Sequence, residues 1–526
     1  MIIRVIRVLS LSFYLWTCAV WAEDVPEIRI GAVELVGCAS LDEEAVREVL
    51  DLGEGTVLEA ERVQAGMDRV LRFYEDRGYP FAAVLLSRLS LEGDRARLGF
   101  KVEEGPKVTI GALEVRGNAI TKPEVILREL RIRSGELYDQ RRIDRGMRHL
   151  ARLDFLERVH PPEVRYDPEK EAVALIVKVE EAQAHRANAA VGYVPGVGET
   201  KGFFTGLVDV SLGNLAGTGR KVQARWQRRD PHASEVFLRY EEPWVFGFPI
   251  HAGGTFGQKQ RTGYTETAAS SFLYFPITER FTGRLSLGWE QVIPDSAGSW
   301  IMSRSASWIG GWTLSYDGTD RRDNPTRGFR LSGSADMVLK GNYATTKDSV
   351  SSETEASPWR AQARRVDRRR YGLNVEHFLP LRRRQVLFIG LHGAAVDSPE
   401  RVLPVSEKLW LGGARSLRGY REEQFGGIRI GWTNVEYRIL LGPESRVFLF
   451  LDGGYVFDRR IEASGKGTTE ASPWRAQARR VEAFKVGYGF GVRVRSRMGI
   501  VGIDYGLGQG DGWMEGKVHV GVENRF

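Results

Sequence analysis

The sequence predicts a chain of two parts: two α+β repeats, followed by an all-β transmembrane barrel of about 16 antiparallel strands. Two observations lead to this fold class. Short motifs recur at an offset of 80 residues in the first third of the chain, and a strict alternation of apolar and polar residues begins near residue 186. A fixed offset indicates an internal repeat, and a period of two is that of a β-strand.

The composition excludes a polytopic helical membrane protein. Hydrophobic residues make up 42% of the 526 residues and the mean hydropathy is −0.29, whereas such a protein needs repeated apolar runs of about 20 residues. Glycine is in excess, at 60 residues. The net charge of +7 comes from 75 basic and 68 acidic residues spread along the chain. Nucleic-acid binders concentrate their charge on one face, so no nucleic-acid partner is expected.

Residues 1–22 are predicted to be a secretory signal peptide. Two arginines precede an apolar stretch over residues 8–20, and the cleavage position follows Ala22. The stretch is too short for a good membrane-spanning helix. A lipoprotein signal at Cys18 is disfavoured because bulky residues precede it. Cleavage would leave Cys38 alone, so no disulfide is expected within the mature chain.

Residues 26–105 and 106–183 are predicted to be two copies of one α+β unit. The motif at 33–37 returns at 113–117, and the same offset relates three glycines of the first copy to three of the second: Gly37 to Gly117, Gly55 to Gly135 and Gly66 to Gly146. Each copy is expected to contain a strand, two helices and two strands. In the first copy, a helical apolar stripe is formed by Val63, Met67, Val70, Leu71 and Tyr74. The stripe is interpreted as core.

Residues 187–526 are predicted to form the barrel. Over residues 484–495 one face is aliphatic or aromatic and the other is charged or glycine. A soluble sandwich also alternates, but its strands average about 5–6 residues, whereas these run to about 9–13 residues, enough to cross a bilayer at a tilt. Short turns at 381–384, 442–446 and 496–499 alternate with long loops at 342–369, 399–424 and 459–482. This asymmetry is typical of an outer-membrane barrel.

Two of the long loops contain the same 13 residues, TEASPWRAQARRV, at 354–366 and at 469–481. We interpret the duplication as a recent insertion, since exposed loops accept length at low entropic cost. A surface adhesive motif is the alternative.

Several motifs occur in an order that resembles the BamA/TamA superfamily of outer-membrane assembly factors, and TamA-like members in particular. They are found at 74–79, 103–106, 115–118, 213–220, 320–328, 411–420 and 450–454. The resemblance implies that the two repeats are POTRA domains and that the barrel is of the bacterial surface antigen type. It implies a bacterial outer-membrane location, with the POTRA domains in the periplasm.

The most specific of these motifs contains Arg418, Gly419 and Tyr420, in the sixth outside loop of the family. By strand alternation, Asp452 lies opposite Leu449 and Leu451, and a carboxylate facing lipid would be costly. The same argument places Glu436 in the lumen. The resemblance implies that the loop folds back into the barrel and that Arg418 meets Asp452 and Glu436. From the residues alone, a solvated loop arginine is the alternative.

No catalytic, metal-binding or cofactor-binding pattern is found. The eight histidines show no metal-ligand spacing, and CxxC, HExxH and GxSxG are absent from the sequence. Residues 213–221 lack the Gly-Lys-Ser/Thr ending of a phosphate-binding loop. We therefore expect neither an enzyme nor a cofactor.

The resemblance implies an insertase that receives unfolded outer-membrane protein or autotransporter clients on the POTRA domains. The clients would be inserted or translocated through a barrel seam that opens laterally. The seam is expected between the first strand (188–194) and the last (517–526), and its residues are Val191, Tyr193, Val520, Val522 and Phe526. The lipid bilayer and a periplasm-spanning protein are the other expected partners.

Two further classes remain open at this stage. A two-partner secretion pore that exports a specific exoprotein shares two POTRA domains, the barrel and the arginine loop. Such pores typically add an N-terminal plug helix and a Pro-rich linker, and only residues 23–25 separate the predicted signal from the first strand. TamA-like proteins usually have three POTRA domains, so a count of two fits neither class fully. A porin or adhesin would need neither the repeats nor Arg418.

Overall fold

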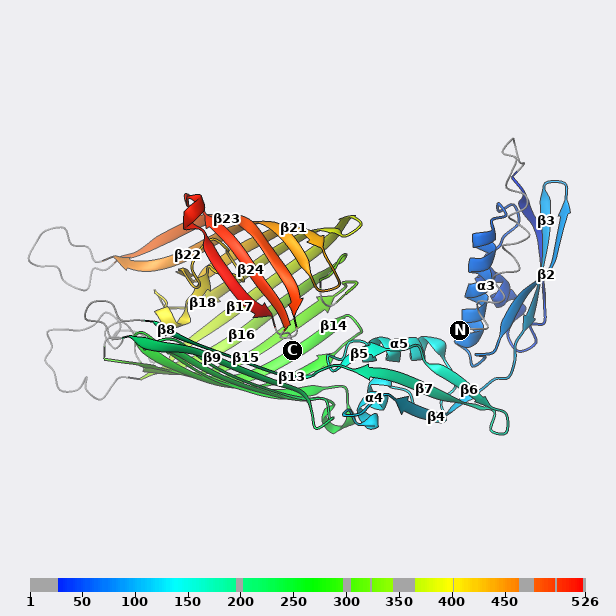
Figure 1. Ribbon diagram of the computed structural model, residues 1–526, viewed down its shortest axis with the longest axis horizontal. Coiled ribbons are helices and arrows are strands. Elements are labelled where there is room, and N and C mark those ends of the chain that lie inside the picture. Colours follow the sequence, from blue (N-terminus) through cyan, green and yellow to red (C-terminus); the bar gives the residue numbers. More distant parts are fainter. Residues whose placement is uncertain are drawn as a thin grey trace, which may run out of the picture. The chain divides into compact units, whose positions relative to one another are not determined.

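The computed structural model describes residues 27–194, 202–296, 304–321, 324–343, 365–400, 402–462, 477–496 and 499–523 (Figure 1). The chain divides into two compact units, Met1–Glu181 and Ala182–Phe526. The expected signal peptide at 1–22 lies outside the described residues. Within the described ranges, no helix has both the length and the apolar character needed to cross a membrane.

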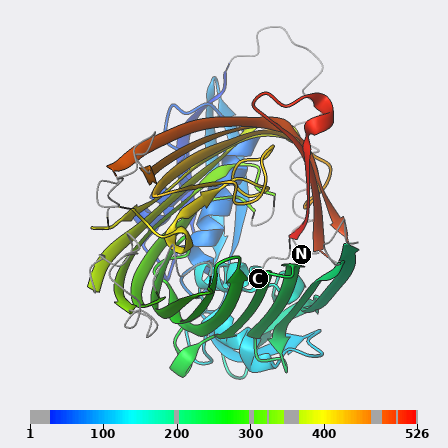
Figure 2. The ribbon, with the colours of Figure 1, turned by 90° about the vertical axis from the view of Figure 1, so that its left-hand side faces the viewer.

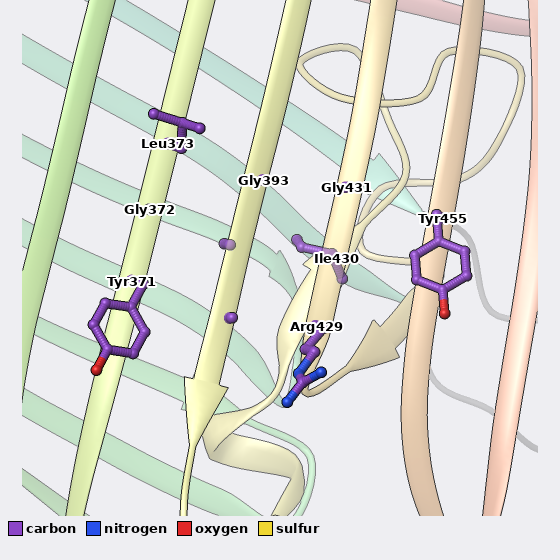
Figure 3. Close-up of a pocket in the computed structure, with 10 residues that line it drawn as sticks. Tyr371, Gly372, Leu373, Gly393, Arg429, Ile430, Gly431 and Tyr455 are labelled. Carbon is purple, nitrogen blue, oxygen red and sulfur yellow. The ribbon is translucent and has the colours of Figure 1, made fainter.

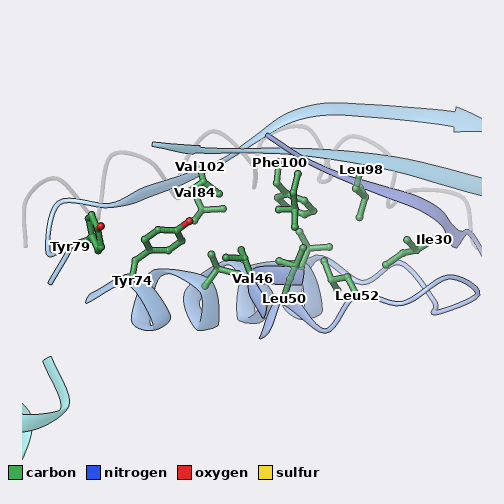
Figure 4. Packing of buried hydrophobic residues seen from close by; sticks show 13 residues of the cluster. Ile30, Val46, Leu50, Leu52, Tyr74, Tyr79, Val84, Leu98, Phe100 and Val102 are labelled. Atoms are coloured by element: carbon green, nitrogen blue, oxygen red, sulfur yellow. The ribbon is translucent and has the colours of Figure 1, made fainter. Parts of the chain in front are cut away.

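The first repeat has the predicted order of elements: β1 (Arg29–Val36), α2 (Glu43–Leu50), α3 (Ala60–Glu75), β2 (Ala83–Glu92) and β3 (Arg95–Glu103). In its sheet β3 is central, parallel to β1 and antiparallel to β2. The predicted stripe of α3 faces this sheet, where Val70 and Tyr74 belong to one buried cluster with Leu98 and Phe100 (Figure 4). Burying apolar surface in this way is the main favourable contribution to folding.

The second repeat contains one strand more than predicted. Its elements are β4 (Thr109–Arg116), α4 (Pro123–Leu130), α5 (Gln140–Leu150), β5 (Leu156–Val159), β6 (Glu163–Asp167) and β7 (Ala172–Glu181). Both β5 and β6 pair with β7. Pro161 and Pro162 separate them, and proline has no N–H to donate to a sheet. The two prolines therefore break what would be one edge strand into two.

Equivalent residues of the two repeats make equivalent close contacts. Gly37 and Gly117 have φ angles of 95° and 86°. A Cβ atom at either position would lie 2.1 Å from a carbonyl oxygen, that of Val102 or Val179. Only glycine fits such a site, because it combines a positive φ with close backbone approach. The 80-residue offset in the sequence thus reflects a shared backbone geometry.

A carboxylate at the end of the last strand of each repeat caps the segment that follows the first strand. Glu104 accepts hydrogen bonds from the backbone N–H groups of Ala39 and Ser40 at 2.9 Å. Glu181 accepts from Ala119, Ile120 and Thr121 at 2.6–3.2 Å. Burial acts to raise the pKa of each carboxyl, but these hydrogen bonds outweigh it and lower the pKa.

The described residues of the second unit form a sheet of 16 antiparallel strands, as predicted. The strands are β8 (His185–Val194), β9 (Phe203–Leu215), β10 (Arg220–Asp230), β11 (Ala233–Glu242), β12 (His251–Arg261), β13 (Tyr264–Pro276), β14 (Phe281–Pro294), β15 (Arg304–Asp317), β16 (Gly328–Tyr343), β17 (Arg365–Arg382), β18 (Gln385–Asp397), β21 (Arg429–Leu440), β22 (Arg446–Glu462), β23 (Gln477–Ser496), β24 (Gly499–Gly508) and β25 (Lys517–Glu523). Each pairs with its neighbour in the chain. The pair β18–β21 spans the loop in which β19 (Leu409–Leu411) and β20 (Phe425–Gly427) form a small hairpin.

Several strands are longer than predicted. β23 has 20 residues and β17 has 18, so they extend into segments that the sequence assigns to loops. The ends of both TEASPWRAQARRV copies consequently lie in strands: residues 365–366 in β17 and 477–481 in β23. The rest of both copies lies outside the described residues.

The sheet curls round and brings its first and last strands to the same side (Figure 2). Its outer face is apolar: along β23, Phe484, Tyr488 and Phe490 are exposed. Its inner face carries polar and charged side chains such as Asp452, Arg493 and Asp504, which are buried. This is the arrangement of a barrel with lipid outside and a polar interior.

Candidate functional site

The segment between β18 and β21, residues 398–428, turns back inside the curved sheet (Figure 2). Leu411, Leu417 and Tyr420 of this segment form a buried cluster with Ile430 of β21 and Val456 of β22. The loop is therefore packed against the inner wall of the barrel.

Arg418 is the centre of this contact and is 3% exposed. Its Nε and Nη2 donate to Oδ2 and Oδ1 of Asp452 at 2.8 and 2.7 Å. Its Nη1 donates to Oε1 of Glu436 at 2.7 Å, and its backbone N–H donates to Oδ2 of Asp452 at 3.0 Å. The structure thus brings Arg418, which the family resemblance places in the lumen, together with the two carboxylates that strand alternation places there. The planar guanidinium makes a bidentate contact that lysine cannot reproduce.

Three further side chains complete the cluster. Asn434 donates to Oδ1 of Asp452 at 2.8 Å and to the carbonyl of Ser416 at 2.9 Å. Arg438 donates to Oε2 of Glu436 at 2.8 Å. The Arg418 guanidinium lies 3.8 Å from the ring centroid of Phe450, within cation–π range. Two cations and two carboxylates balance in charge, which is the condition for burying them.

The loop backbone rests on glycines of β23 and β24. A Cβ on Gly487 would lie 1.8 Å from the carbonyl oxygen of Arg418, and one on Gly506 would lie 2.6 Å from the N of Gly419. Gly419 itself has a φ of 90°, and a Cβ there would lie 2.5 Å from Leu507. These glycines let the loop approach the strands closely. They account for part of the glycine excess in the composition.

Tyr420, the last residue of the motif, makes its contacts through its hydroxyl group and its ring. Its hydroxyl donates to the carbonyl of Val486 at 3.0 Å and accepts from the N–H of Gln509 at 2.9 Å. Its ring packs edge-on against Phe425. The tyrosine therefore joins the loop to β23 and to the segment after β24.

A second buried ionic cluster holds the start of the same loop. Glu407 of the loop contacts both Arg368 of β17 and Lys340 of β16, with the lysine Nζ 2.7 Å from Oε1. Lys340 also lies 3.4 Å from Oε1 of Glu400. Beside them, Lys408 donates to Asp458 of β22 at 2.6 Å. The loop is thus tied to the wall at its beginning as well as at Arg418.

One of the family-like motifs spans residues 320–328, and its described residues 320–321 and 324–327 lie between β15 and β16. Oδ1 of Asp320 accepts the N–H groups of Thr326 and Arg327 at 2.9 and 3.1 Å. Burial acts to raise the pKa of Asp320, but hydrogen bonds from Thr326 outweigh it and lower the pKa. Asn324 reaches the carbonyls of Gly442 and Ser445, both at 3.4 Å. The motif therefore links the β15–β16 connection to the β21–β22 turn at one end of the barrel.

The expected seam residues lie at the two ends of the sheet. Val191 and Tyr193 of β8 are 79% and 58% exposed, and Val520 of β25 is 69% exposed. Among the residues described, β8 pairs only with β9 and β25 only with β24. Val522 is in β25, but its side chain lies outside the described set, as does Phe526. Strand β8 also begins earlier than predicted, at His185.

Sequence reasoning missed Asn434, Arg438, the glycine contacts and the second cluster. Alternation along β16 and β17 places Lys340 and Arg368 on the inner face, but it does not indicate which loop residues contact them. Within the described part of the chain, no three His, Cys, Asp or Glu side chains are grouped to hold a metal ion.

Comparison with known proteins matches both parts of the chain to families. The Omp85 superfamily domain matches residues 214–526. The POTRA family, described as the surface antigen variable number repeat, matches residues 28–105 and 108–182.

Two of the curated relatives named outer membrane protein assembly factor BamA match most of this chain. The protein of Nitratidesulfovibrio vulgaris is 24% identical over 481 residues, which cover 85% of this chain and 55% of that protein. The protein of Neisseria meningitidis serogroup B is 23% identical over 490 residues, which cover 82% of this chain and 57% of that protein. The chain spans about half the length of these two relatives.

Solved structures share the fold. BamA from Haemophilus ducreyi, lacking POTRA domains 1–3, aligns with a TM-score of 0.55 and 17% identity, over 94% of this chain and 98% of that one. CdiB from Escherichia coli aligns with a TM-score of 0.52 and 14% identity, over 95% and 91%. These likenesses confirm the predicted architecture. The chain belongs to the Omp85 superfamily, as an outer-membrane barrel protein with POTRA repeats in the periplasm.

Proposed function

We propose that this chain is an assembly factor for outer-membrane proteins. Unfolded clients, autotransporters among them, are received on the POTRA repeats and enter the membrane through a seam between β8 and β25. The proposed activity needs neither a catalytic residue nor a cofactor. The observation that carries the proposal is that, among the described residues, each end strand of the 16-stranded sheet has a single partner, since β8 pairs with β9 and β25 pairs with β24.

The seam is proposed to be the place where a client strand adds to the sheet. Over the described residues β25 has 7 residues and β23 has 20, so the described part of β25 offers few hydrogen bonds for closing the barrel. An unpaired strand edge is a template for another chain. The family names of the two BamA relatives support the same function.

The POTRA repeats are proposed to receive clients by strand addition. β2 is an edge strand of the first sheet, and its Leu89 and Leu91 are 53% and 57% exposed. An extended peptide can pair with such an edge through main-chain hydrogen bonds, which give affinity, while contacts of alternate side chains give specificity. The lumen loop held by Arg418 is proposed to keep the barrel wall rigid while the seam opens.

A depletion experiment with rescue tests the proposal. Depleting the chain should lower many integral outer-membrane proteins at once. Loss of one secreted protein with intact outer-membrane proteins would contradict the proposal and favour a two-partner secretion pore. Quantitative proteomics of isolated outer membranes separates these outcomes.

Rescue with a cross-linked seam tests the lateral opening. In a Cys38→Ser background, the pair Val191→Cys and Val520→Cys should fail to rescue when oxidised and should rescue when reduced. The matched control is Leu285→Cys with Trp312→Cys, which are partners on the adjacent strands β14 and β15. That pair should rescue in both states, since it ties two strands that are already joined. Equal rescue by the oxidised seam pair would refute lateral opening.

A further inference from the structure

A shallow groove of about 420 Å³ lies on the outer face of the barrel, across β17, β18, β21 and β22 (Figure 3). Its walls are Tyr371, Leu373 and Tyr455, which are 44%, 52% and 41% exposed. Its floor is made of small residues, and Gly393 and Gly431 lie at its centre. The volume falls within the range of about 300–1,000 Å³ that is usual for ligand pockets.

The groove follows from the strand register. One row of opposed residues runs Leu373, Gly393, Gly431 and Tyr455 across the four strands. Two adjacent glycines between two large side chains leave a trough. On the inner side of the same strands, Ile430 and Val456 are buried under the lumen loop, so the groove faces away from the lumen and toward lipid.

Packing does not require glycine at the two floor positions, Gly393 and Gly431. A Cβ on Gly393 would meet only a carbonyl oxygen at 3.9 Å, and one on Gly431 a carbonyl oxygen at 3.6 Å, which are ordinary contacts. Gly487 and Gly506, in contrast, have no room for a Cβ. Glycine weakens a strand and often marks a place where a ligand approaches closely.

A cation stands at one end of the groove. Arg429 is the first residue of β21, directly after the long loop, and is exposed. Its guanidinium lies 5.7 Å from the ring centroid of Phe457. Among the described side chains, no carboxylate forms an ion pair with it. Long loops are on the outside of outer-membrane barrels, so Arg429 lies toward the outside end of its strand.

We propose that the groove binds one acyl chain of an outer-leaflet lipid whose phosphate head group carries a net negative charge and pairs with Arg429. Arginine recognises phosphate through paired N–H donors. Tyrosines with an apolar body and a polar tip are enriched at the membrane interface. The apolar trough matches an acyl chain, and the cation at its end matches an anionic head group.

Native mass spectrometry of the full chain in detergent tests the site. The chain is titrated with phosphatidylglycerol and, separately, with phosphatidylcholine of the same acyl chains. We expect one phosphatidylglycerol to be retained in preference to phosphatidylcholine. Equal retention of the two lipids would overturn the proposal.

Variants assign the binding to the groove. Gly393→Leu with Gly431→Leu fills the trough and should abolish the retained lipid. The matched control, Gly310→Leu, adds the same side chain at an exposed outer-face glycine of β15 with open space around it, and should bind lipid like the native chain. Loss of the lipid in the control as well, or retention in the double variant, would refute the site.

The head-group contact has its own pair of variants. Arg429→Ala should bind phosphatidylglycerol about tenfold more weakly, the loss expected for a charge-assisted hydrogen bond, and should no longer discriminate against phosphatidylcholine. Arg304→Ala, an exposed arginine at the equivalent end of β15, should have no effect. Equal effects of the two variants would contradict the role of Arg429.

The same measurements test two other possible occupants of the groove, inorganic phosphate and a second copy of the chain. If inorganic phosphate at millimolar concentration displaces the lipid, the site binds phosphate alone and the acyl chain plays no part. If the double glycine variant changes a dimer to a monomer and leaves the lipid count unchanged, the groove is a contact between copies of the chain. Either result overturns the proposal.

Discussion

The two units of the chain bury different kinds of side chain. In the described part of the periplasmic unit, the only polar residue buried as a whole is Thr121, and the core consists of apolar clusters. In the described part of the barrel, buried charged residues are numerous, and they include Arg368, Arg418, Glu436 and Asp452.

The difference arises from the surroundings of each unit. A POTRA repeat has water outside, so its apolar side chains go inside. The barrel has lipid outside, so its apolar side chains face outward and its polar ones face the lumen. A lumen filled by a loop must then pair its charges, because an unpaired buried charge is costly. The barrel should accordingly be sensitive to loss of a charge, and the repeats to loss of apolar volume.

The largest effect is expected for Arg418→Met. It leaves Asp452 and Glu436 with fewer partners in a buried site, and breaking a buried pair costs about 3–5 kcal/mol. The midpoint of heat-induced unfolding of the barrel in detergent should fall, as read from gel mobility of heated samples. The unfolding midpoint of Arg418→Lys should lie between that of Arg418→Met and that of the native chain. An unchanged midpoint for Arg418→Met would show that the barrel does not depend on the lumen pair.

The corresponding change in the periplasmic unit is Leu98→Ala. Leu98 is 1% exposed in the first core cluster, and truncating a buried leucine costs about 2–5 kcal/mol. Proteolysis of the full chain should cleave the first repeat faster while the barrel midpoint stays the same. Leu91→Ala, on the exposed part of the same sheet, is the control and should leave cleavage unchanged. A shift of the barrel midpoint by Leu98→Ala would show that the stabilities of the two units are not independent.

A smaller effect is expected for Gly487→Ala. The added Cβ collides with the carbonyl oxygen of Arg418, and relieving such overpacking costs about 1–3 kcal/mol. The barrel midpoint should fall less than with Arg418→Met. Gly310→Ala, where a Cβ has open space, is the matched control. If both alanines behave alike, the close approach of the loop does not contribute to stability.

The smallest effect concerns pH. The folded pKa of Glu104 is below its ordinary value, so the carboxylate stabilises the first repeat above that ordinary value, about 4.3. This stabilisation is lost as pH falls through the lowered pKa. Proteolysis of the full chain between pH 7 and pH 3, using an acid-stable protease at the low end, should show native and Glu104→Gln chains converging at low pH. Glu54→Gln, an exposed carboxylate, is the control. A constant difference across the range would contradict the prediction.

Much of the architecture could be predicted because it depends on local periodicity. The offset between Gly37 and Gly117 identifies the repeats, since each residue meets a backbone constraint inside its own repeat. Alternation along β22 places Asp452 on the lumen face, since neighbouring side chains of a strand point to opposite sides. The broken edge strand of the second repeat was missed, although Pro161 and Pro162 contain the signal.

The contacts inside and outside the barrel depend on register between strands that are distant in sequence. Arg418 is a loop residue, and its contact with Asp452 was expected only through the family resemblance. Glu407 meets Lys340 and Arg368 from a loop with no periodicity to read. Gly393 and Gly431 form one trough because β18 and β21 pair in a single register across a loop of more than 30 residues. Periodicity within a strand therefore assigns a side chain to a face, whereas folding of the whole sheet selects its neighbours on that face.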